Sequence, residues 1–366
     1  MHLKPAPLRA LTGVRFFAAS WVVLYHGIYL AGDDIPALLR RIASGGPLAV
    51  SFFFVLSGFI LTYAYADADS LGLNYRAFFV NRFARIYPVY VLSFFADAPR
   101  AILYFFGTAE PVEAILKSVV AATAYLTLTQ SWLPRMASAW NAPGWSLSAE
   151  VFFYILFPFI VGLSYRLHSR RRLILALLVV YVTSLVFNTS ATVIGTAGAN
   201  WLLPFFKRFP PLCLGDFVIG VLTARLVSLA PATRRVQTNT ASTAISIGGV
   251  LAVMCIVLNT RDAESLWLHA ALCPIFAVVI AALAQDGNLL ARVLSWRPFM
   301  LLGAASYAIY LLHQPLLTFV IAIVGAERGI MIFAIYAVIV VVASIGVYWF
   351  IEEPSRKFVR RRFNAP

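Results

Sequence analysis

The segment LTGVRFFAASWVVLYHGIYL, residues 11–30, is long and apolar enough to cross a membrane, yet it contains Arg15 and His26. A charge at the centre of a bilayer costs roughly 2.5–3.5 kcal/mol on insertion scales, so ionisable residues in membrane spans usually serve a function. The two residues are separated by close to three helical turns, which puts them on one helix face, about 16 Å apart along the axis. We therefore expect this face to carry a functional site. An arginine that snorkels to the interface and a histidine bonded to a neighbouring helix would also fit.

The whole chain shares the apolar character of this segment. Of its 366 residues 61% are hydrophobic and only 12% are charged, whereas soluble domains are about half apolar and a quarter charged. Apolar stretches recur from end to end and leave no room for a soluble domain of useful size. The sequence therefore predicts an all-α, polytopic membrane protein in which residues 1–366 form one membrane-embedded domain. The first apolar segment is too long for the core of a signal peptide, so we expect it to be retained.

Apolar windows long enough to cross a bilayer define the expected spans. They lie at 12–31, 47–66, 149–165, 172–190, 211–230, 243–259, 266–284, 299–323 and 329–351. The region 86–130 contains several prolines and charges, and would form either one crossing with a re-entrant or interfacial segment, or two crossings. One crossing leaves most of the 29 Lys and Arg residues on the cytoplasmic side, as the positive-inside rule requires. We therefore expect about ten transmembrane helices, with the N- and C-termini cytoplasmic.

The net charge of +14 does not indicate a nucleic-acid partner. Basic residues cluster in short loops between the apolar segments, where they orient a membrane protein, and they form no basic face interleaved with aromatic residues. We expect contacts with membrane lipids and none with nucleic acid. The three cysteines, Cys213, Cys255 and Cys273, are scattered and match neither a metal nor a disulfide spacing, so no metal site is expected.

Four further motifs follow the segment that contains Arg15 and His26. They are SFFFVLSGFILTYAY (51–65), NRFARIYPVY (81–90), WNAPGWSLSAEVFFY (140–154) and SYAIYLLHQP (306–315), the last followed by IEEPSRK (351–357). In the first of them Ser57 and Gly58 are small enough to let two helices pack closely. Several of these motifs are aromatic-rich spans when taken alone, and their order along one chain makes the set specific.

This ordered set resembles the acyltransferase-3 family of integral membrane acyltransferases, whose members acylate bacterial surface polysaccharides and some small molecules. The resemblance covers essentially the whole chain, and Arg15 and His26 match the family's N-terminal Arg-x10-His signature. One block departs from the family's pattern, which is usually Ile-Glu-Arg-Pro, because this chain has Ile351-Glu352-Glu353-Pro354. An anionic contact made by that arginine in the family is therefore not expected here.

Acyl transfer from a thioester to an alcohol requires a base for the hydroxyl group, hydrogen-bond donors for the oxyanion and a dry, enclosed site. His26 is the candidate base, because histidine titrates near neutral pH. Glu150 is expected to orient His26, as a carboxylate does in catalytic triads. The alternative is that its negative charge only interacts favourably with the dipole at the start of its own helix. Ser146 and Ser148 would bind substrate, or would cap the same helix.

Three arginines are candidates for binding the donor. Arg82 and Arg85 suit the phosphates of coenzyme A, because guanidinium groups pair with phosphate oxygens. The alternative is that both only anchor the chain at the cytoplasmic surface. Arg15 is assigned to both the catalytic and the donor-binding sets, because it shares a helix face with His26 and would contact the donor's phosphates or its pantetheine arm.

The remaining histidines receive different interpretations. His313 lies one helical turn after Tyr310, so the two side chains face one way and would line the substrate cavity, with His313 donating to an acceptor sugar. Hydrogen bonds to a neighbouring helix are the alternative. His168 and His269 are interpreted as structural residues.

The resemblance implies an O-acyltransferase in the bacterial cytoplasmic (inner) membrane. It would move an acyl group, most simply acetyl, from cytosolic acyl-coenzyme A to a hydroxyl of an extracytoplasmic or lipid-linked glycan, with acyl-coenzyme A as a co-substrate and no tightly bound cofactor. Acylation of a small molecule such as a macrolide or a lipo-oligosaccharide is the alternative acceptor. A polytopic transporter with an intramembrane ion path is the alternative class, although no matching halves are visible in the sequence. Direct transfer and transfer through an acyl-enzyme both fit the residues.

Overall fold

The computed structural model of the protein describes residues 8–32, 35–65, 74–229, 239–260, 262–285 and 287–363. Within these ranges every regular element is a helix, and ten helical segments are long and apolar enough to cross a membrane. The protein is therefore a polytopic helical membrane protein, as the sequence predicts. Ten crossings, an even number, would leave both ends of the chain on one side of the membrane.

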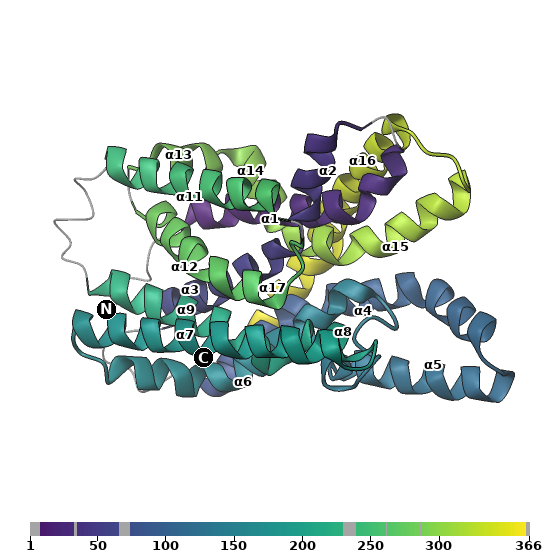
Figure 1. Ribbon diagram of the computed structural model, residues 1–366, viewed down its shortest axis with the longest axis horizontal. Coiled ribbons are helices and arrows are strands. Elements are labelled where there is room, and N and C mark those ends of the chain that lie inside the picture. Colours follow the sequence, from purple (N-terminus) through teal and green to yellow (C-terminus); the bar gives the residue numbers. More distant parts are fainter. Residues whose placement is uncertain are drawn as a thin grey trace.

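The helices follow one another with short connections. They are α1 (Arg9–Gly27), η1 (Ile28–Ala31), α2 (Ala37–Ser44), α3 (Leu48–Tyr65), α4 (Tyr75–Thr108), α5 (Pro111–Leu126), η2 (Gln130–Trp132), η3 (Ala142–Gly144), α6 (Trp145–Tyr165), α7 (Arg170–Ala197), α8 (Leu202–Phe206), α9 (Pro210–Ser228), α11 (Asn239–Asn259), α12 (Leu266–Leu283), α13 (Leu289–Leu294), α14 (Arg297–Ala304), α15 (Ser306–Val324), α16 (Ile330–Val347), η4 (Tyr348–Glu352) and α17 (Glu353–Phe363). Most of the long helices run roughly along the longest axis of the molecule (Figure 1).

The region 86–130 forms a helical hairpin. Helix α4 begins at Tyr75, well before the expected crossing, and continues through Pro88 and Pro99 to Thr108. Helix α5 then returns beside α4, and its 16 residues are too few for it to count among the candidate spans. The structure therefore favours one crossing followed by a shorter return helix. The expected span 299–323 is also divided, because α14 ends before Ala305 and α15 begins after it.

Helix α3 packs closely against α9 because glycines lie at their contact. A Cβ atom on Gly58 would stand 2.1 Å from the backbone oxygen of Phe217, and one on Gly220 would stand 2.0 Å from that of Val55. The two backbones therefore touch, as small residues allow in membrane helices. This geometry confirms that Gly58 permits close packing.

Gly58→Val is expected to destabilise the protein strongly. The added carbons would overlap the α9 backbone, so the expected cost is at or above the upper end of the ~1–3 kcal/mol typical of overpacking. Gly162→Val on α6 is the matched control, because a Cβ there would meet nothing within 4 Å. The measurement is the melting temperature of each variant in detergent. Equal melting temperatures for the two variants would contradict the described contact.

Helix α1 lies within the bundle and contacts α3, α13, α14 and α15. Both Arg15 and His26 line cavities between helices, so their shared face turns toward protein. This placement spares both side chains the cost of facing lipid.

Candidate active site

A cavity, named here the arginine cavity, lies between α1, α3, α4, α6 and α15. Its polar lining side chains are those of Arg15, Ser57, Arg82, Arg85, Ser146, Glu150, Tyr154, Ser306, Tyr307 and Tyr310. Segments far apart in the sequence thus bring the three candidate donor-binding arginines together. Arg82 and Arg85 both line this cavity from α4, which favours the interpretation of donor binding over that of surface anchors.

The arginines of this cavity differ in their hydrogen bonding. Arg82 donates from Nη2 to the hydroxyl of Tyr65 at 3.2 Å, and its guanidinium lies 5.4 Å from the centre of the Tyr65 ring. Within the part of the chain that the structure describes, Arg15 and Arg85 donate no hydrogen bond. Two guanidinium groups with free donors in one cavity suit an anion that offers several oxygen atoms.

Glu352 contributes a carboxylate to this group of charges, and it was missing from the predicted site. It is the last residue of η4, a π-helical turn, and only 3% of its surface is exposed. Its charge interacts with those of Arg85 and Arg15, and its Oε2 atom has no hydrogen-bond partner among the described residues. Its place in the IEEP block was the available signal, and π-helical turns often mark functional sites.

Glu353, the residue that departs from the family pattern, has different partners. It forms ion pairs along α17 with Arg356 at 3.2 Å and with Lys357 at 3.6 Å. Because Glu353 is not a lining residue of the arginine cavity, the departure alters α17 and leaves the lining unchanged.

Glu150 lies in the arginine cavity and does not contact His26. Its Oε1 atom accepts hydrogen bonds from Ser57 Oγ at 3.1 Å and from Tyr154 OH at 2.5 Å. The expected pairing of Glu150 with His26 is therefore wrong. The two residues line different cavities, and Glu150 instead adds negative charge near Arg15.

The two serines of the WSLSAE motif have different surroundings. Helix α6 begins at Trp145 with Gly144 at its N-cap, so the interpretation of the serines as caps is wrong. Ser146 donates to the oxygen of Pro143 at 3.0 Å and accepts from Tyr310 at 2.9 Å at the cavity wall. Ser148 is buried, lines neither cavity, and its hydroxyl has no partner among the described residues.

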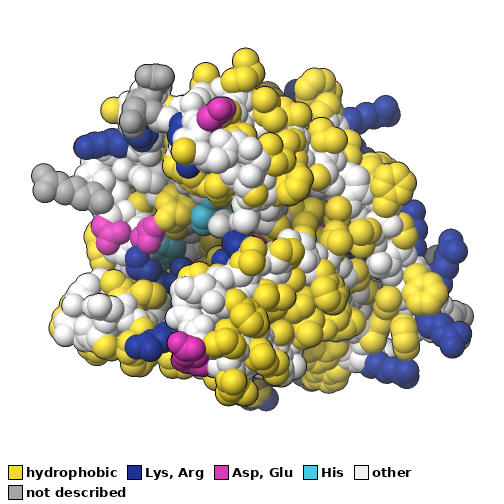
Figure 2. All heavy atoms as spheres, turned by 90° about the vertical axis from the view of Figure 1, so that its right-hand side faces the viewer, with side chains coloured by type: hydrophobic (Ala, Val, Ile, Leu, Met, Phe, Trp, Pro, Cys, Tyr) yellow, Lys and Arg dark blue, Asp and Glu magenta, His cyan; other side chains and the backbone are white. Residues whose placement is uncertain are grey.

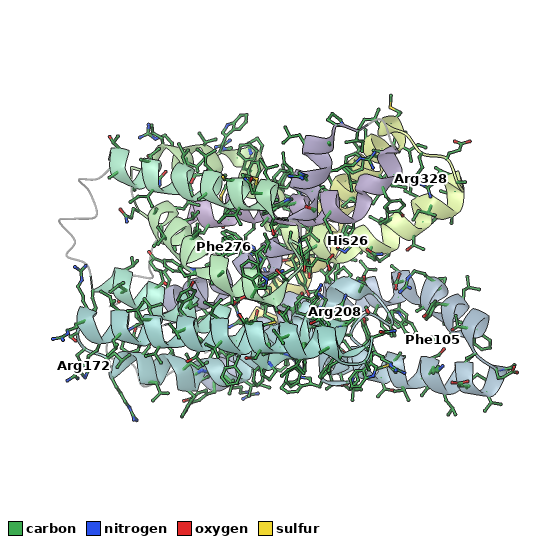
Figure 3. The ribbon with its side chains drawn as sticks, viewed as in Figure 1. His26, Phe105, Arg172, Arg208, Phe276 and Arg328 are labelled. Carbon is green, nitrogen blue, oxygen red and sulfur yellow. The ribbon has the colours of Figure 1, made fainter. Side chains whose placement is uncertain are left out.

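A second cavity, named here the histidine cavity, lies between α1, α3, α7, α9 and α12. Its ionisable lining residues are Tyr25, His26, Lys207, Arg208, Cys213, Asp216, Glu264, His269 and Tyr310. Figure 2 looks onto the end of the molecule at the right of Figure 1 and shows a hollow with histidine side chains between acidic and basic ones. Figure 3 places His26 and Arg208 near the middle of the molecule, between its upper and lower groups of helices. The two cavities share the lining residues Val50, Phe54 and Tyr310.

His26 and His313 form a hydrogen-bonded pair. His313 Nε2 lies 3.2 Å from His26 Nδ1, and His313 Nδ1 lies 2.6 Å from the backbone oxygen of Tyr310. Since a carbonyl only accepts, the proton of neutral His313 is on Nδ1, and its Nε2 accepts from His26 Nδ1–H. His26 Nδ1 is also 3.0 Å from the oxygen of Val22, which requires the same proton. His26 Nε2 therefore carries a lone pair, as a general base requires.

His313 is placed to orient the His26 ring by a hydrogen bond and does not reach the acyl-acceptor substrate. It is fully buried and lines neither cavity, so the expectation that it donates to an acceptor sugar is wrong. Tyr310 does line both cavities, with its ring centre 6.1 Å from that of His313. The two residues share a helix face as predicted, and the one nearer the cavities is Tyr310.

A polar cluster beside His26 was also missing from the predicted site. Tyr25 donates to Glu264 Oε1, and Lys207 Nζ donates to Glu264 Oε2 at 3.0 Å. Burial opposes ionisation of Glu264, but these two hydrogen bonds hold the pKa of its carboxyl below the ordinary value. Glu264 is therefore charged at neutral pH. Its position in a short loop, far from α1 in sequence, gave no pattern from which the contact could be predicted.

Within the described residues, no group of three or more His, Cys, Asp or Glu side chains is placed to hold a metal ion. The three cysteines are free, with Cys213 and Cys273 buried and Cys255 exposed.

Comparison with known proteins identifies the family of this chain. The family model described as "Acyltransferase domain" matches residues 8–349. The chain belongs to the acyltransferase-3 family. It is similar to the acyltransferase MdmB of Streptomyces mycarofaciens, with 30% identity over 97% of this chain and 93% of that protein.

Two further relatives in the comparison are longer proteins. The YrhL protein of Bacillus subtilis is 25% identical over 97% of this chain and 56% of its own length. The O-acetyltransferase OatA of Staphylococcus aureus is 23% identical over 97% of this chain and 58% of its own length. This acyltransferase-3 chain thus spans little more than half of those two proteins. No solved structure matches it. The family match confirms the resemblance seen in the motifs, and the protein is a multi-pass membrane acyltransferase.

Proposed function

We propose that this acyltransferase-3 protein is an O-acyltransferase of the bacterial inner membrane. It moves an acyl group, most simply acetyl, from cytosolic acyl-coenzyme A to a hydroxyl group of an extracytoplasmic or lipid-linked glycan. The observation that carries the proposal is the pair of cavities, one lined by arginines and one by histidines, that share Val50, Phe54 and Tyr310. Similarity to a protein named O-acetyltransferase supports acetyl as the transferred group.

The donor's phosphates bind in the arginine cavity. Arg15 and Arg85 offer guanidinium donors that no described residue occupies, and guanidinium forks pair well with phosphate oxygens. The expected topology puts the start of α1 and of α4 at the cytoplasmic side, so this cavity is the one nearer to cytosolic acyl-coenzyme A. The arm of the donor then points from the arginines toward the shared residues.

The acceptor binds in the histidine cavity, where His26 acts as the base. Its Nε2 atom takes the proton of the acceptor hydroxyl as that oxygen attacks the acyl carbonyl carbon. His313 holds the ring in the required tautomer, a role that a carboxylate fills in catalytic triads. Tyr310 lies at the shared wall, where its hydroxyl donates to Ser146 Oγ and to the backbone oxygen of Pro143. Its proton would have to turn away from these two acceptors to stabilise the developing oxyanion.

The test uses membranes from cells that express the protein, incubated with labelled acetyl-coenzyme A. We expect label in extracted lipid-linked sugar or polymeric glycan with the wild type, and none in membranes without the protein. Free coenzyme A should appear in equal amount, because each transfer releases one thiol. If the wild-type membranes neither transfer label nor bind acetyl-coenzyme A, the proposal is wrong and a transport role becomes the better account.

Arg85→Ala is expected to weaken donor binding. Removing one of two guanidinium groups that face the phosphates should raise the apparent KM for acetyl-coenzyme A roughly tenfold or more, since a hydrogen bond to a charged group is worth about 1.5–3 kcal/mol. The maximal rate should change less than KM. Arg172→Ala, at the exposed start of α7, is the matched control. An unchanged KM in Arg85→Ala would remove Arg85 from the donor site.

A further inference from the structure

The histidine cavity contains a second histidine, His269, whose imidazole is hydrogen-bonded to a serine hydroxyl. Ser51 lies in the first turn of α3, and its Oγ atom is 2.9 Å from Nδ1 of His269 on α12. Both residues line the cavity that also contains His26. A serine hydroxyl bonded to an imidazole nitrogen is the arrangement that activates serine as a nucleophile.

The surroundings of this pair fix its geometry. The imidazole of His269 also forms a hydrogen bond with the backbone of Ala263, so a third group holds the base. Asp216 is a second hydrogen-bond partner of Ser51. Ser51 therefore has two polar partners, His269 and Asp216, and only 3% of its surface is exposed. A low-dielectric site of this kind strengthens both hydrogen bonds.

The position of Ser51 relates it to both substrates. Ser51 lines the histidine cavity, and Val50 and Phe54, its neighbours on α3, line both cavities. An acyl group that reaches the shared wall from the arginine cavity meets Ser51 on the side where His26 and the acceptor lie. Among the lining residues of the histidine cavity, the serine, threonine or cysteine side chains are those of Ser51 and Cys213. Of these two, Ser51 is the one bonded to an imidazole.

We propose that Ser51 is a nucleophile that carries the acyl group as an ester between donor and acceptor, with His269 as its base. This inference rests on the proposed function and adds a covalent intermediate to it. In the first step Ser51 Oγ forms a bond to the acyl carbonyl carbon, and the carbon–sulfur bond of the thioester breaks. The Ser51 proton passes to His269 Nδ1 and then to the departing thiolate, which leaves as coenzyme A.

The second step uses the other histidine. The acceptor oxygen attacks the ester carbonyl carbon of acyl-Ser51 while His26 Nε2 takes the acceptor's proton. The bond between the acyl carbon and Ser51 Oγ then breaks, and the proton held by His26 returns to the Ser51 oxygen. The two histidines of the cavity thus serve one half-reaction each, and both end neutral.

The experiment incubates the purified protein in lipid nanodiscs with labelled acetyl-coenzyme A and no acceptor. After an acid quench, the wild type should carry up to one acetyl group per chain, found by mass spectrometry on the peptide that contains Ser51. Ser51→Ala should carry none there and should transfer to glycan roughly 100-fold or more slowly. Ser51→Cys should carry a thioester, which neutral hydroxylamine cleaves. Ser164→Ala is the matched control, because Ser164 is a buried serine whose hydroxyl donates to Val161 of its own helix.

The outcomes separate this inference from the proposed function. If Ser51→Ala transfers acetyl at the wild-type rate and wild-type Ser51 stays unlabelled, the covalent step is wrong and direct transfer remains. If Ser51→Ala does not fold, label on wild-type Ser51 and a hydroxylamine-sensitive label on Ser51→Cys still support the step, and their absence overturns it. If the wild type transfers acetyl to nothing, the proposed function fails together with the inference.

Discussion

His26→Ala is expected to lower the rate of acyl transfer by roughly 10²–10⁴-fold, which is the usual contribution of a general base. The reason is the hydrogen bonding of the ring, because Nδ1 must donate to Val22 and His313 and Nε2 is then the nitrogen free to accept a proton. The measurement is the initial rate of label transfer from acetyl-coenzyme A in membranes with matched protein content. Binding of acetyl-coenzyme A should persist, because His26 does not line the arginine cavity.

His168→Ala is the matched control for this substitution. His168 is exposed in the loop between α6 and α7 and lines neither cavity, so its loss should leave the rate unchanged. His313→Ala should also reduce the rate while leaving the KM for the donor unchanged, because it removes the partner that orients His26. A folded His26→Ala protein with the wild-type rate would exclude His26 as the base.

Arg15→Ala is expected to lower kcat/KM for acetyl-coenzyme A by roughly 100-fold. Two losses combine in this variant. The donor loses one of two unoccupied guanidinium groups, and the carboxylate of Glu352 loses one of its three cationic neighbours, the others being Arg85 and Arg356. The measurement is initial rate against donor concentration, together with the melting temperature of the variant.

Arg15→Lys separates charge from shape. Lysine keeps the positive charge near Glu352 but lacks the planar fork that binds two phosphate oxygens, so it should restore the melting temperature and only part of kcat/KM. Arg9→Ala is the control, because Arg9 is exposed and lies more than one and a half turns earlier on α1. Full activity in Arg15→Ala would show that this arginine serves only to hold α1 in the bundle.

The sequence predicted which face of α1 matters. Helical spacing alone requires Arg15 and His26 to lie on one side, and the structure turns that side inward. Hydropathy likewise predicted the spans, because an apolar stretch of sufficient length has few alternatives in a membrane. The small residue Gly58 predicted a close contact, although its partner Gly220 could not be predicted from α3 alone.

The partners across the bundle could not be predicted in the same way. His26 pairs with His313, which is 287 positions away, and Glu150 pairs with Ser57 and Tyr154. Triad logic favoured Glu150 for His26 because a carboxylate is the usual partner of a catalytic histidine. Packing decides which helices face each other, and the residue pattern within one helix does not reveal its partner. The same limit explains why Glu352 entered the site only with the structure.

Sealed inverted membrane vesicles test most directly whether an acyl group enters at the arginine cavity and leaves at the histidine cavity. Labelled acetyl-coenzyme A is added outside these vesicles, where the cytoplasmic face is exposed, and acylated glycan is recovered from the lumen after the external label has been removed. We predict luminal label with the wild type, little with Arg15→Ala and none with His26→Ala. Label on the outer surface alone, or equal luminal label in all three, would contradict the account.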